Sequence, residues 1–274
     1  MIGINRENLS LIFDDNPISR AYINILINFN FTKINLFELT DNYFFLKKVN
    51  RKINFINKNL KAINLIKNKN LTNFLFEVEE YFEFERGFIN KMYKSENINH
   101  FENIITINNR NVNSPELKEQ ILSFGKEITL NTSRKIFKDI LDTNKLFLHI
   151  HPGYLPDIRG ADGSLNSLDK KKEIGSSAFF INRKIDEGDI ILRKKFKLPK
   201  FKHLKLELFN DSELYNIWYS FFDPLLRAKI LKELILIKNF KITKQETEIG
   251  NYYSFIEKKN IKKILINVID KSET

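Results

Sequence analysis

The spacing of apolar and polar positions near the N-terminus predicts a strand, a helix and a second strand. A short apolar run covers residues 9–13, and turn-forming residues follow it, with Pro17 suited to the first turn of a helix. Apolar residues then recur at mixed spacings of three and four over residues 18–29, as in an amphipathic helix. Residues 33–39 have the pattern of another strand. Parallel α/β sheets begin in this way.

Later segments continue this alternation, although the pattern over residues 46–70 is ambiguous. Further strands are expected at residues 102–107, 127–130, 145–150, 178–181 and 190–196, and further helices at residues 71–84 and 115–124. A long helical stretch covers residues 212–238, where Pro224 is expected to split it, and residues 252–268 are expected to form a last amphipathic helix. The sequence therefore predicts a Rossmann-like α/β domain with a mostly parallel sheet over residues 1–200. A small, mainly helical extension follows over residues 201–274.

Composition limits the class of protein. The chain has 274 residues, of which 42% are apolar, so it is long enough to bury a substantial core. It contains no cysteine, which excludes disulfides and thiolate metal sites. No apolar run approaches the length of a membrane span, and the first residues lack the pattern of a signal peptide. We therefore expect a cytoplasmic protein that does not bind a membrane.

The formal net charge is +11. The lysines are scattered among carboxylates rather than gathered in one block, so nucleic-acid binding is disfavoured. An anionic small molecule, such as a nucleotide sugar or a folate, fits the sign of the charge.

The candidate chemistry lies between residues 146 and 194. His149 and His151 stand two apart at the end of an apolar strand, so both side chains are expected on one face, at the carboxyl end where open α/β sheets place ligands. A rigid loop follows in the sequence HPGYLP, and Arg159-Gly160 ends it. Asp186 lies further along in the turn IDEG and is expected to form an acid/base pair with His151.

The ordered set HPGYLP, RG, GSS and IDEG resembles the folate-dependent formyltransferases, which include glycinamide ribonucleotide, methionyl-tRNA and sugar N-formyltransferases. The matching positions are His151, Pro152, Gly153, Leu155, Pro156, Arg159, Gly160, Gly175, Ser177, Ile185, Asp186 and Gly188. The resemblance implies the formyltransferase fold and a one-carbon transferase that uses 10-formyltetrahydrofolate as formyl donor. The preceding segment fits this fold loosely, and the first hundred residues match only as a generic strand, helix and strand.

The resemblance also implies site residues. The catalytic set is His149, His151 and Asp186, with Tyr154, Arg159 and Asp162 on the substrate and Thr132, Ile181, Ile185 and Gly188 on the folate. Three departures from the family stand out. His149 replaces the family's catalytic asparagine, Phe179 stands where a histidine is frequent, and residues 130–136 lack the glycines of the pterin pocket. A neutral imidazole still offers one N–H to a developing oxyanion, although its charge is expected to depend on pH near neutrality.

Several functions stay open on these residues. The favoured acceptor is an amine of a nucleotide-linked amino sugar, because the residues after Lys200 look helical and lack the sizeable β-rich domain of methionyl-tRNA formyltransferase. A tRNA-acting enzyme, a formyltetrahydrofolate hydrolase and a catalytically impaired folate- or sugar-binding protein are the alternatives. A zinc hydrolase needs further ligands, and only His100 and His203 are left to supply imidazoles, so we expect no metal. A homodimer is compatible with the sequence.

Overall fold

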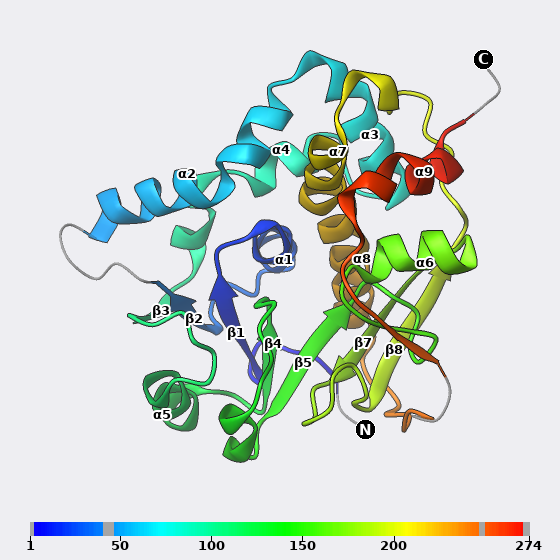
Figure 1. Cartoon of the computed structure of the whole chain (residues 1–274). Helices are drawn as coiled ribbons and strands as arrows, with labels where there is room; N and C mark the ends of the chain where they lie inside the picture. The colour runs from blue at the N-terminus through cyan, green and yellow to red at the C-terminus, as the bar shows by residue number, and fades with distance from the viewer. Residues whose placement is uncertain (1–2, 41–46, 247–249, 271–274) are drawn as a thin grey trace.

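The computed structural model describes residues 3–40, 47–246 and 250–270, which form an α/β fold around a seven-stranded sheet (Figure 1). The strand order is β3-β2-β1-β4-β5-β7-β8. The first five strands run parallel, and β7 is antiparallel to both its neighbours. Their bounds are β1 Leu9–Asp14, β2 Asn35–Leu39, β3 Asn103–Ile107, β4 Ile128–Asn131, β5 Leu146–His151, β7 Ile174–Phe180 and β8 Ile190–Phe196. A separate two-stranded parallel sheet pairs β6 (Ile158–Gly160) with β9 (Asn251–Tyr253).

Helices cover both faces of the main sheet. Their bounds are α1 Pro17–Asn28, α2 Lys47–Ile66, α3 Thr72–Tyr81, α4 Phe88–Met92, α5 Pro115–Phe124, α6 Gly163–Lys171, α7 Asp211–Ile217, α8 Asp223–Leu236 and α9 Ile261–Leu265. Figure 1 shows α1 and α8 on one face and α5 on the other. No helix in the described part of the chain is long and apolar enough to span a membrane.

The strands supply side chains to two hydrophobic cores because successive residues of a strand point to opposite faces. On β1, Leu11 and Phe13 belong to the larger core, which lies against α1, α3 and α8. Ile12, between them, belongs to the smaller core against α5. All three side chains are buried, as expected of a strand inside a parallel sheet.

Local capping sets the start of α1 and so orients the end of β1. Asn16 precedes the helix in an extended conformation, and its side chain accepts hydrogen bonds from the amides of Ile18 and Ser19. The Ser19 hydroxyl accepts a reciprocal bond from the Asn16 amide, at 2.9 Å. The expected opening of strand, helix and strand is confirmed, and so is α5, which Ser114 caps.

The helical stretch divides into two α-helices with Pro224 in the first turn of the second, as expected, but the chain stays helical between them. α7 continues through a π-helix at residues 218–222 into α8 without leaving the helical path. The wider π turn lets the Asp223 amide bond to the Trp218 carbonyl, five residues back, so the proline falls in the first turn of the next helix. The rings of Trp218 and Phe222 stack 3.8 Å apart across this turn.

The C-terminal tail is also less helical than expected. Of residues 252–268, only residues 261–265 form an α-helix, α9, with short 3₁₀ turns on either side. The tail begins instead as β9, where the Tyr253 carbonyl accepts a hydrogen bond from the Ala161 amide at 2.9 Å. The ambiguous residues 46–70 contain α2, and the sequence did not indicate α6, β6 or β9.

A buried ion pair joins α8 to the central sheet. The Arg227 Nε donates to the Asp223 Oδ2 at 2.8 Å, and its Nη1 donates to the carbonyl of Ile150 on β5. The Ser164 hydroxyl bonds to the other carboxylate oxygen of Asp223 at 3.1 Å. Both charged residues are less than a tenth exposed.

Arg227→Met should lower the free energy of unfolding by roughly 3–5 kcal/mol, because it leaves the Asp223 carboxylate buried without its cation. Lys232→Met on the same helix is the control and should change stability by less than about 0.5 kcal/mol, since Lys232 is only partly buried. Urea denaturation of the two variants measures both effects. Equal losses in the two proteins would contradict the assigned role of the ion pair.

Candidate active site

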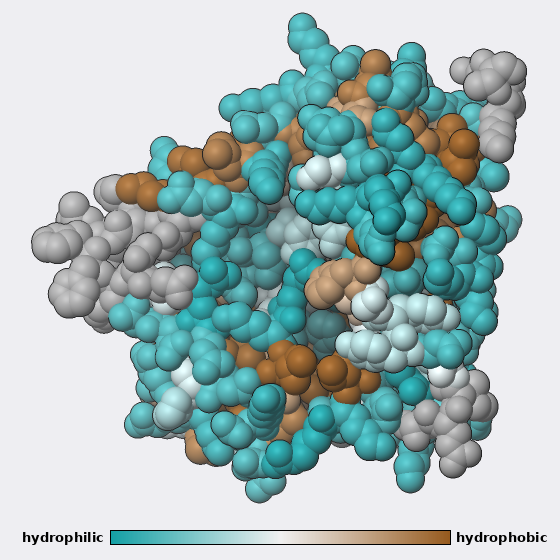
Figure 2. All heavy atoms as spheres, in the orientation of Figure 1, coloured by the Kyte–Doolittle hydropathy of each residue, from teal (hydrophilic) through white to brown (hydrophobic). Residues whose placement is uncertain are grey.

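A pocket of about 370 Å³ opens at the carboxyl ends of β4 and β5. His149, His151 and Asp186 all line it. Figure 2 shows the molecule hollowed near the middle of the face drawn, with apolar residues along one side of the hollow. The pocket therefore lies where the rule for open α/β sheets places ligands.

His151 is the most enclosed of these residues, at 3% exposed. Its Nε2 lies 2.9 Å from the Ile158 carbonyl oxygen, which can only accept, so Nε2 carries a proton. Its Nδ1 faces the Asp186 Oδ2 at 3.6 Å. Nδ1 is therefore the nitrogen at which this imidazole can take up or release a proton.

Two glycines make room for the His151 ring. A Cβ on Gly153 would lie 2.7 Å from the ring Nε2, and a Cβ on Gly163 would lie 2.8 Å from the same atom. Real Cβ atoms do not approach so closely, so a side chain at either position would displace the imidazole. The loop after β5 is held by serines of β7, since the Ser176 hydroxyl donates to the His151 carbonyl and the Ser177 hydroxyl to the Gly153 carbonyl.

Asp186 reaches His151 from the turn between β7 and β8. Its backbone is left-handed, with φ of 56°, a conformation that aspartate tolerates better than most residues. The Oδ2 atom accepts a hydrogen bond from the Gly160 amide at 2.8 Å, and the backbone carbonyl accepts one from the Gln245 side chain at 3.1 Å. The carboxylate is thus fixed from two sides beside the imidazole.

His149 lies on the same face of β5 and is partly exposed to the pocket. The side-chain amide of Asn131, on β4, lies 3.3 Å from the His149 Nδ1. The ring of Phe179 packs edge-on at 5.7 Å between centroids and holds the imidazole from the other strand. Phe179 therefore supports the ring of His149.

Burial disfavours the charged form of both imidazoles and so lowers the pKa of each. Desolvation, followed by the nearby positive charge of Arg227, lowers the pKa of His149 to about 3. Burial also lowers the pKa of His151, although Asp186 favours its charged form. His149 is accordingly neutral over the physiological range, and the expectation that its charge changes near neutral pH is wrong.

The three residues expected to contact the substrate do not all line the pocket. Asp162 lines the pocket, but its two oxygens accept hydrogen bonds from the Tyr215 hydroxyl at 2.8 Å and the Ile256 amide at 3.1 Å. Burial raises the pKa of Asp162. Arg159 is buried and lies 3.5 Å from Glu187, and Tyr154 packs beneath the cations of Arg193 and Lys195. Among the residues that the structure describes, Arg159 and Tyr154 do not line this pocket.

Of the four residues expected to hold the folate, two line the pocket and two do not. Ile181 and Ile185 line the pocket, and Ile185 is 40% exposed there. Thr132 and Gly188 are not among the described residues that line it. The Thr132 hydroxyl donates to the Ile12 carbonyl, and a Cβ on Gly188 would lie 1.6 Å from the Phe180 carbonyl oxygen, so both contacts are structural.

Sequence reasoning missed several contributors to the site, among them Asn131, Arg227, Tyr252 and Phe255. Asn131 and Arg227 line the pocket beside the imidazoles, and Tyr252 and Phe255 line it with side chains that are 61% and 66% exposed. Asn131 ends a buried strand, so the strand-end rule that selected the histidines would also have selected it. The other three come from segments distant in the sequence. Within the described ranges, no three His, Asp or Glu side chains are grouped as metal ligands would be.

No protein-family model and no curated protein sequence matches this chain. Among solved structures, a sugar N-formyltransferase from Shewanella sp. FDAARGOS_354 matches with a TM-score of 0.50 and 15% identity, over 98% of this chain and 91% of the other. A 4-N formyltransferase from Francisella tularensis matches with a TM-score of 0.48 and 16% identity, over 92% and 78% of the two chains. The first likeness establishes the fold: the chain has the Rossmann-like formyltransferase fold that its motifs predict.

The low pKa of His149 makes a prediction about stability. The unfolded chain protonates this side chain below about pH 6.5, whereas the folded protein leaves it neutral down to about pH 3. The unfolded state therefore binds the extra proton as the pH falls, and the free energy of unfolding should drop by up to roughly 1.4 kcal/mol per pH unit through this residue. Urea denaturation between pH 7 and 4 should show a shallower drop in His149→Asn than in the wild type.

His100→Asn is the control for this measurement, because His100 is exposed. The control should follow the wild-type dependence on pH. An unchanged slope in His149→Asn would show that His149 is not held neutral in the folded protein.

Proposed function

We propose that the protein transfers a formyl group from 10-formyltetrahydrofolate to an amine of a small substrate, namely a nucleotide-linked amino sugar. The observation that carries the proposal is the meeting of a neutral imidazole, His149, with an imidazole and carboxylate pair, His151 and Asp186, at one end of a pocket. The formyltransferase fold supports the same assignment.

The pocket fits a folate donor. Its lining includes the aromatic rings of Phe137 and Phe179 and the aliphatic side chains of Ile136, Ile181 and Ile185. Flat and apolar walls of this kind, with a few polar groups at one end, suit the planar pterin ring of a folate. When bound there, 10-formyltetrahydrofolate would supply the formyl carbon that the amine attacks.

The chain's own residues have distinct tasks in this reaction. The His149 Nε2–H donates a hydrogen bond to the oxygen that gains negative charge as the amine attacks a formyl group. The His151 Nδ1 takes the proton that the attacking amine loses and gives it to the nitrogen from which the formyl group would leave, and Asp186 stabilises the imidazolium in between. The Ile158 carbonyl and the two flanking glycines keep the His151 ring in place throughout.

The residues at the mouth of the pocket suit an acceptor that is anionic and carries an aromatic ring. Arg134, Lys135, Arg183 and Lys184 line it, and these cations suit a diphosphate. The exposed rings of Tyr252 and Phe255 suit a nucleobase. We assign the chemistry and the diphosphate contacts to residues 1–200, and recognition of the nucleobase to residues 201–274, which contribute these two rings.

Incubation of the protein with 10-formyltetrahydrofolate and a panel of nucleotide amino sugars tests the proposal. Release of tetrahydrofolate should require one of the acceptors and should yield its N-formyl derivative. Formate released at the same rate without any acceptor would identify a hydrolase instead. Folate bound without turnover of any acceptor in the panel would identify a binding protein.

Asp186→Asn should preserve the fold and lower turnover by roughly a hundredfold to ten-thousandfold, the usual contribution of a positioned acid or base. Asparagine tolerates the left-handed backbone at this position and can still accept the hydrogen bond of the Gly160 amide. The imidazole, however, loses the carboxylate that favours its protonated form. Steady-state kinetics with the accepted sugar measure the loss, and wild-type turnover in the variant would remove Asp186 from the mechanism.

A further inference from the structure

The side-chain amide of Asn131 faces His149 in one orientation only. The Ser133 amide donates to the Asn131 Oδ1 at 2.8 Å, and the Asn131 Nδ2 donates to the Ser133 carbonyl at 3.0 Å. An amide oxygen can only accept and an amide nitrogen can only donate, so these two bonds determine which atom is which. The nitrogen is therefore the atom that lies 3.3 Å from the His149 Nδ1.

We propose that Asn131 is a positioning residue that fixes the tautomer of His149, with Nδ1 accepting from Asn131 and the proton on Nε2. A donor on Asn131 requires a lone pair on Nδ1, and a neutral imidazole then carries its single proton on Nε2. The contribution of this tautomer to catalysis rests on the proposed formyl transfer. The tautomer itself rests only on the contacts of Asn131.

The surroundings of His149 offer no competing partner for Nδ1 among the described contacts. Asn131 is 2% exposed, so water has little access to the bond. Phe179 packs against the ring edge-on, and the positive charge of Arg227 opposes a second proton on it. The charged or titratable groups that act on the ring are Arg227 from α8, Asp186 from the turn before β8 and His151 from β5 itself.

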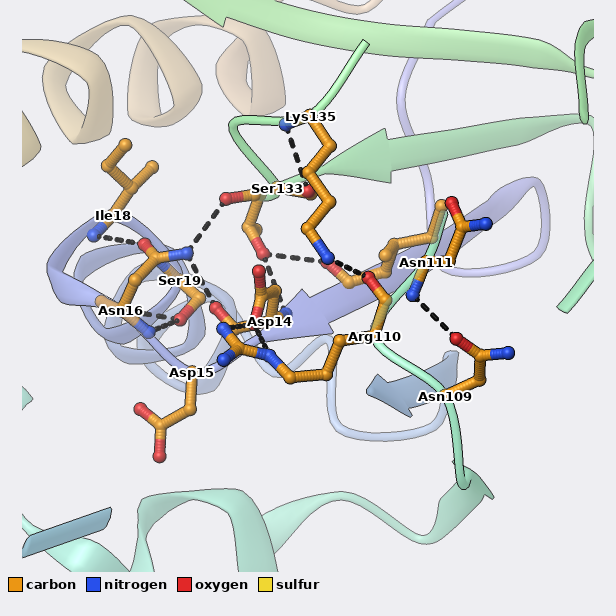
Figure 3. A network of polar contacts seen from close by, with 12 residues as sticks. Asp14, Asp15, Asn16, Ile18, Ser19, Asn109, Arg110, Asn111, Ser133 and Lys135 are labelled. Carbon is orange, nitrogen blue, oxygen red and sulfur yellow. Dashed lines mark hydrogen bonds and ion pairs between the residues drawn. The ribbon is translucent and has the colours of Figure 1, made fainter. Parts of the chain in front are cut away.

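A polar network holds the backbone that orients Asn131 (Figure 3). The Asn16 side chain, at the start of α1, donates to the Thr132 carbonyl at 3.0 Å and to the Asp14 carbonyl at 2.6 Å. Lys135 donates to the Arg110 carbonyl, and Arg110 in turn pairs with Asp14 at 2.6 Å. The loop after β4 is thus tied to the end of β1 and to the loop after β3.

The role matters because an imidazole, unlike the amide that it replaces in the family, has two neutral tautomers. Only the tautomer with a proton on Nε2 leaves a donor for the pocket while Nδ1 accepts from Asn131. The other tautomer would turn a lone pair toward the oxygen that needs a hydrogen bond. A wrong tautomer in the serine-protease triad lowers turnover by about 10⁴-fold, which shows how large such an effect can be.

Asn131→Asp is the sharpest test, because aspartate has the same shape but offers only acceptors when ionised. It should therefore move the single proton of the neutral His149 ring from Nε2 to Nδ1. ¹⁵N NMR of the free protein reads the protonation of each ring nitrogen directly. The spectrum has signals from four histidines, and His149→Asn identifies those of His149 by their loss.

The wild type should show His149 as the Nε2–H tautomer from pH 8 down to about pH 5. Asn131→Asp should show a proton on Nδ1 at neutral pH, and Asn131→Ala should show a mixture of tautomers. Thr129→Val is the matched control, since Thr129 lies two residues earlier on the same face of β4 and its buried hydroxyl has no partner in the described structure. That control should keep the wild-type spectrum.

Kinetics then connect the tautomer to catalysis. Asn131→Asp should lower kcat by roughly a hundredfold to a thousandfold, the loss expected for one oxyanion donor, with the KM of the acceptor little changed. In the His149→Asn background the same substitution should cost less than about tenfold, because an amide has no tautomers for Asn131 to select. A full loss in that background would mean that Asn131 acts otherwise than through His149.

An Nδ1–H tautomer in the wild-type spectrum would overturn the proposal, and so would an Asn131→Ala spectrum identical to the wild type. The second result applies even where Asn131→Asp fails to fold. The expected spectra without formyl transfer to any acceptor would sink the proposed function while the role of Asn131 in setting the tautomer stood.

Discussion

The requirement that polar groups enclosed at the carboxyl edge of the sheet have hydrogen-bond partners organises the whole site. Leaving such a group unpaired in a protein interior costs about 1–3 kcal/mol, and more for a charge. Each buried group here consequently fixes another: the Ile158 carbonyl fixes the His151 ring, and the Asn131 amide fixes His149. The Arg227 guanidinium donates a hydrogen bond to the carbonyl of Ile150, which lies between the two histidines on β5. The geometry follows from satisfying these groups together.

Closure of the site depends on segments far from it in the sequence. The Gln245 side chain donates to the carbonyls of Asp186 and Gly188, which holds the turn that carries the carboxylate. Asp162 accepts from the Ile256 amide and so holds the wall that follows β9, while β9 itself pairs with β6 beside the His151 loop. The C-terminal residues therefore help to position Asp186 and the loop after His151, as well as lining the pocket.

The sequence predicted what is local and strongly periodic. β1, α1, α5 and β5 follow from apolar spacing and capping residues, and the strand-end rule brought His149 and His151 to the pocket. It could not predict β6 and β9, because each has three residues and exists only through pairing with the other. Pro224 lies in the first turn of a second α-helix, as expected, but the π turn that joins the two helices was not expected. Such a turn depends on packing around Trp218, which no local pattern shows.

The difference between local patterns and packing with distant residues also explains which site residues could be inferred from the sequence. A motif identifies a backbone position, but the direction of its side chain depends on neighbours that the motif does not contain. Thr132 and Gly188 belong to segments beside the pocket, yet the Thr132 hydroxyl turns to β1 and Gly188 serves a close backbone contact. His149 shows the converse case. Its sequence position suggested an imidazole that titrates near neutral pH, whereas its surroundings of Phe179, Asn131 and Arg227 lower its pKa. In the proposed mechanism a histidine can donate as an amide would because these surroundings suppress its charge and select one tautomer, the two respects in which imidazole differs from asparagine.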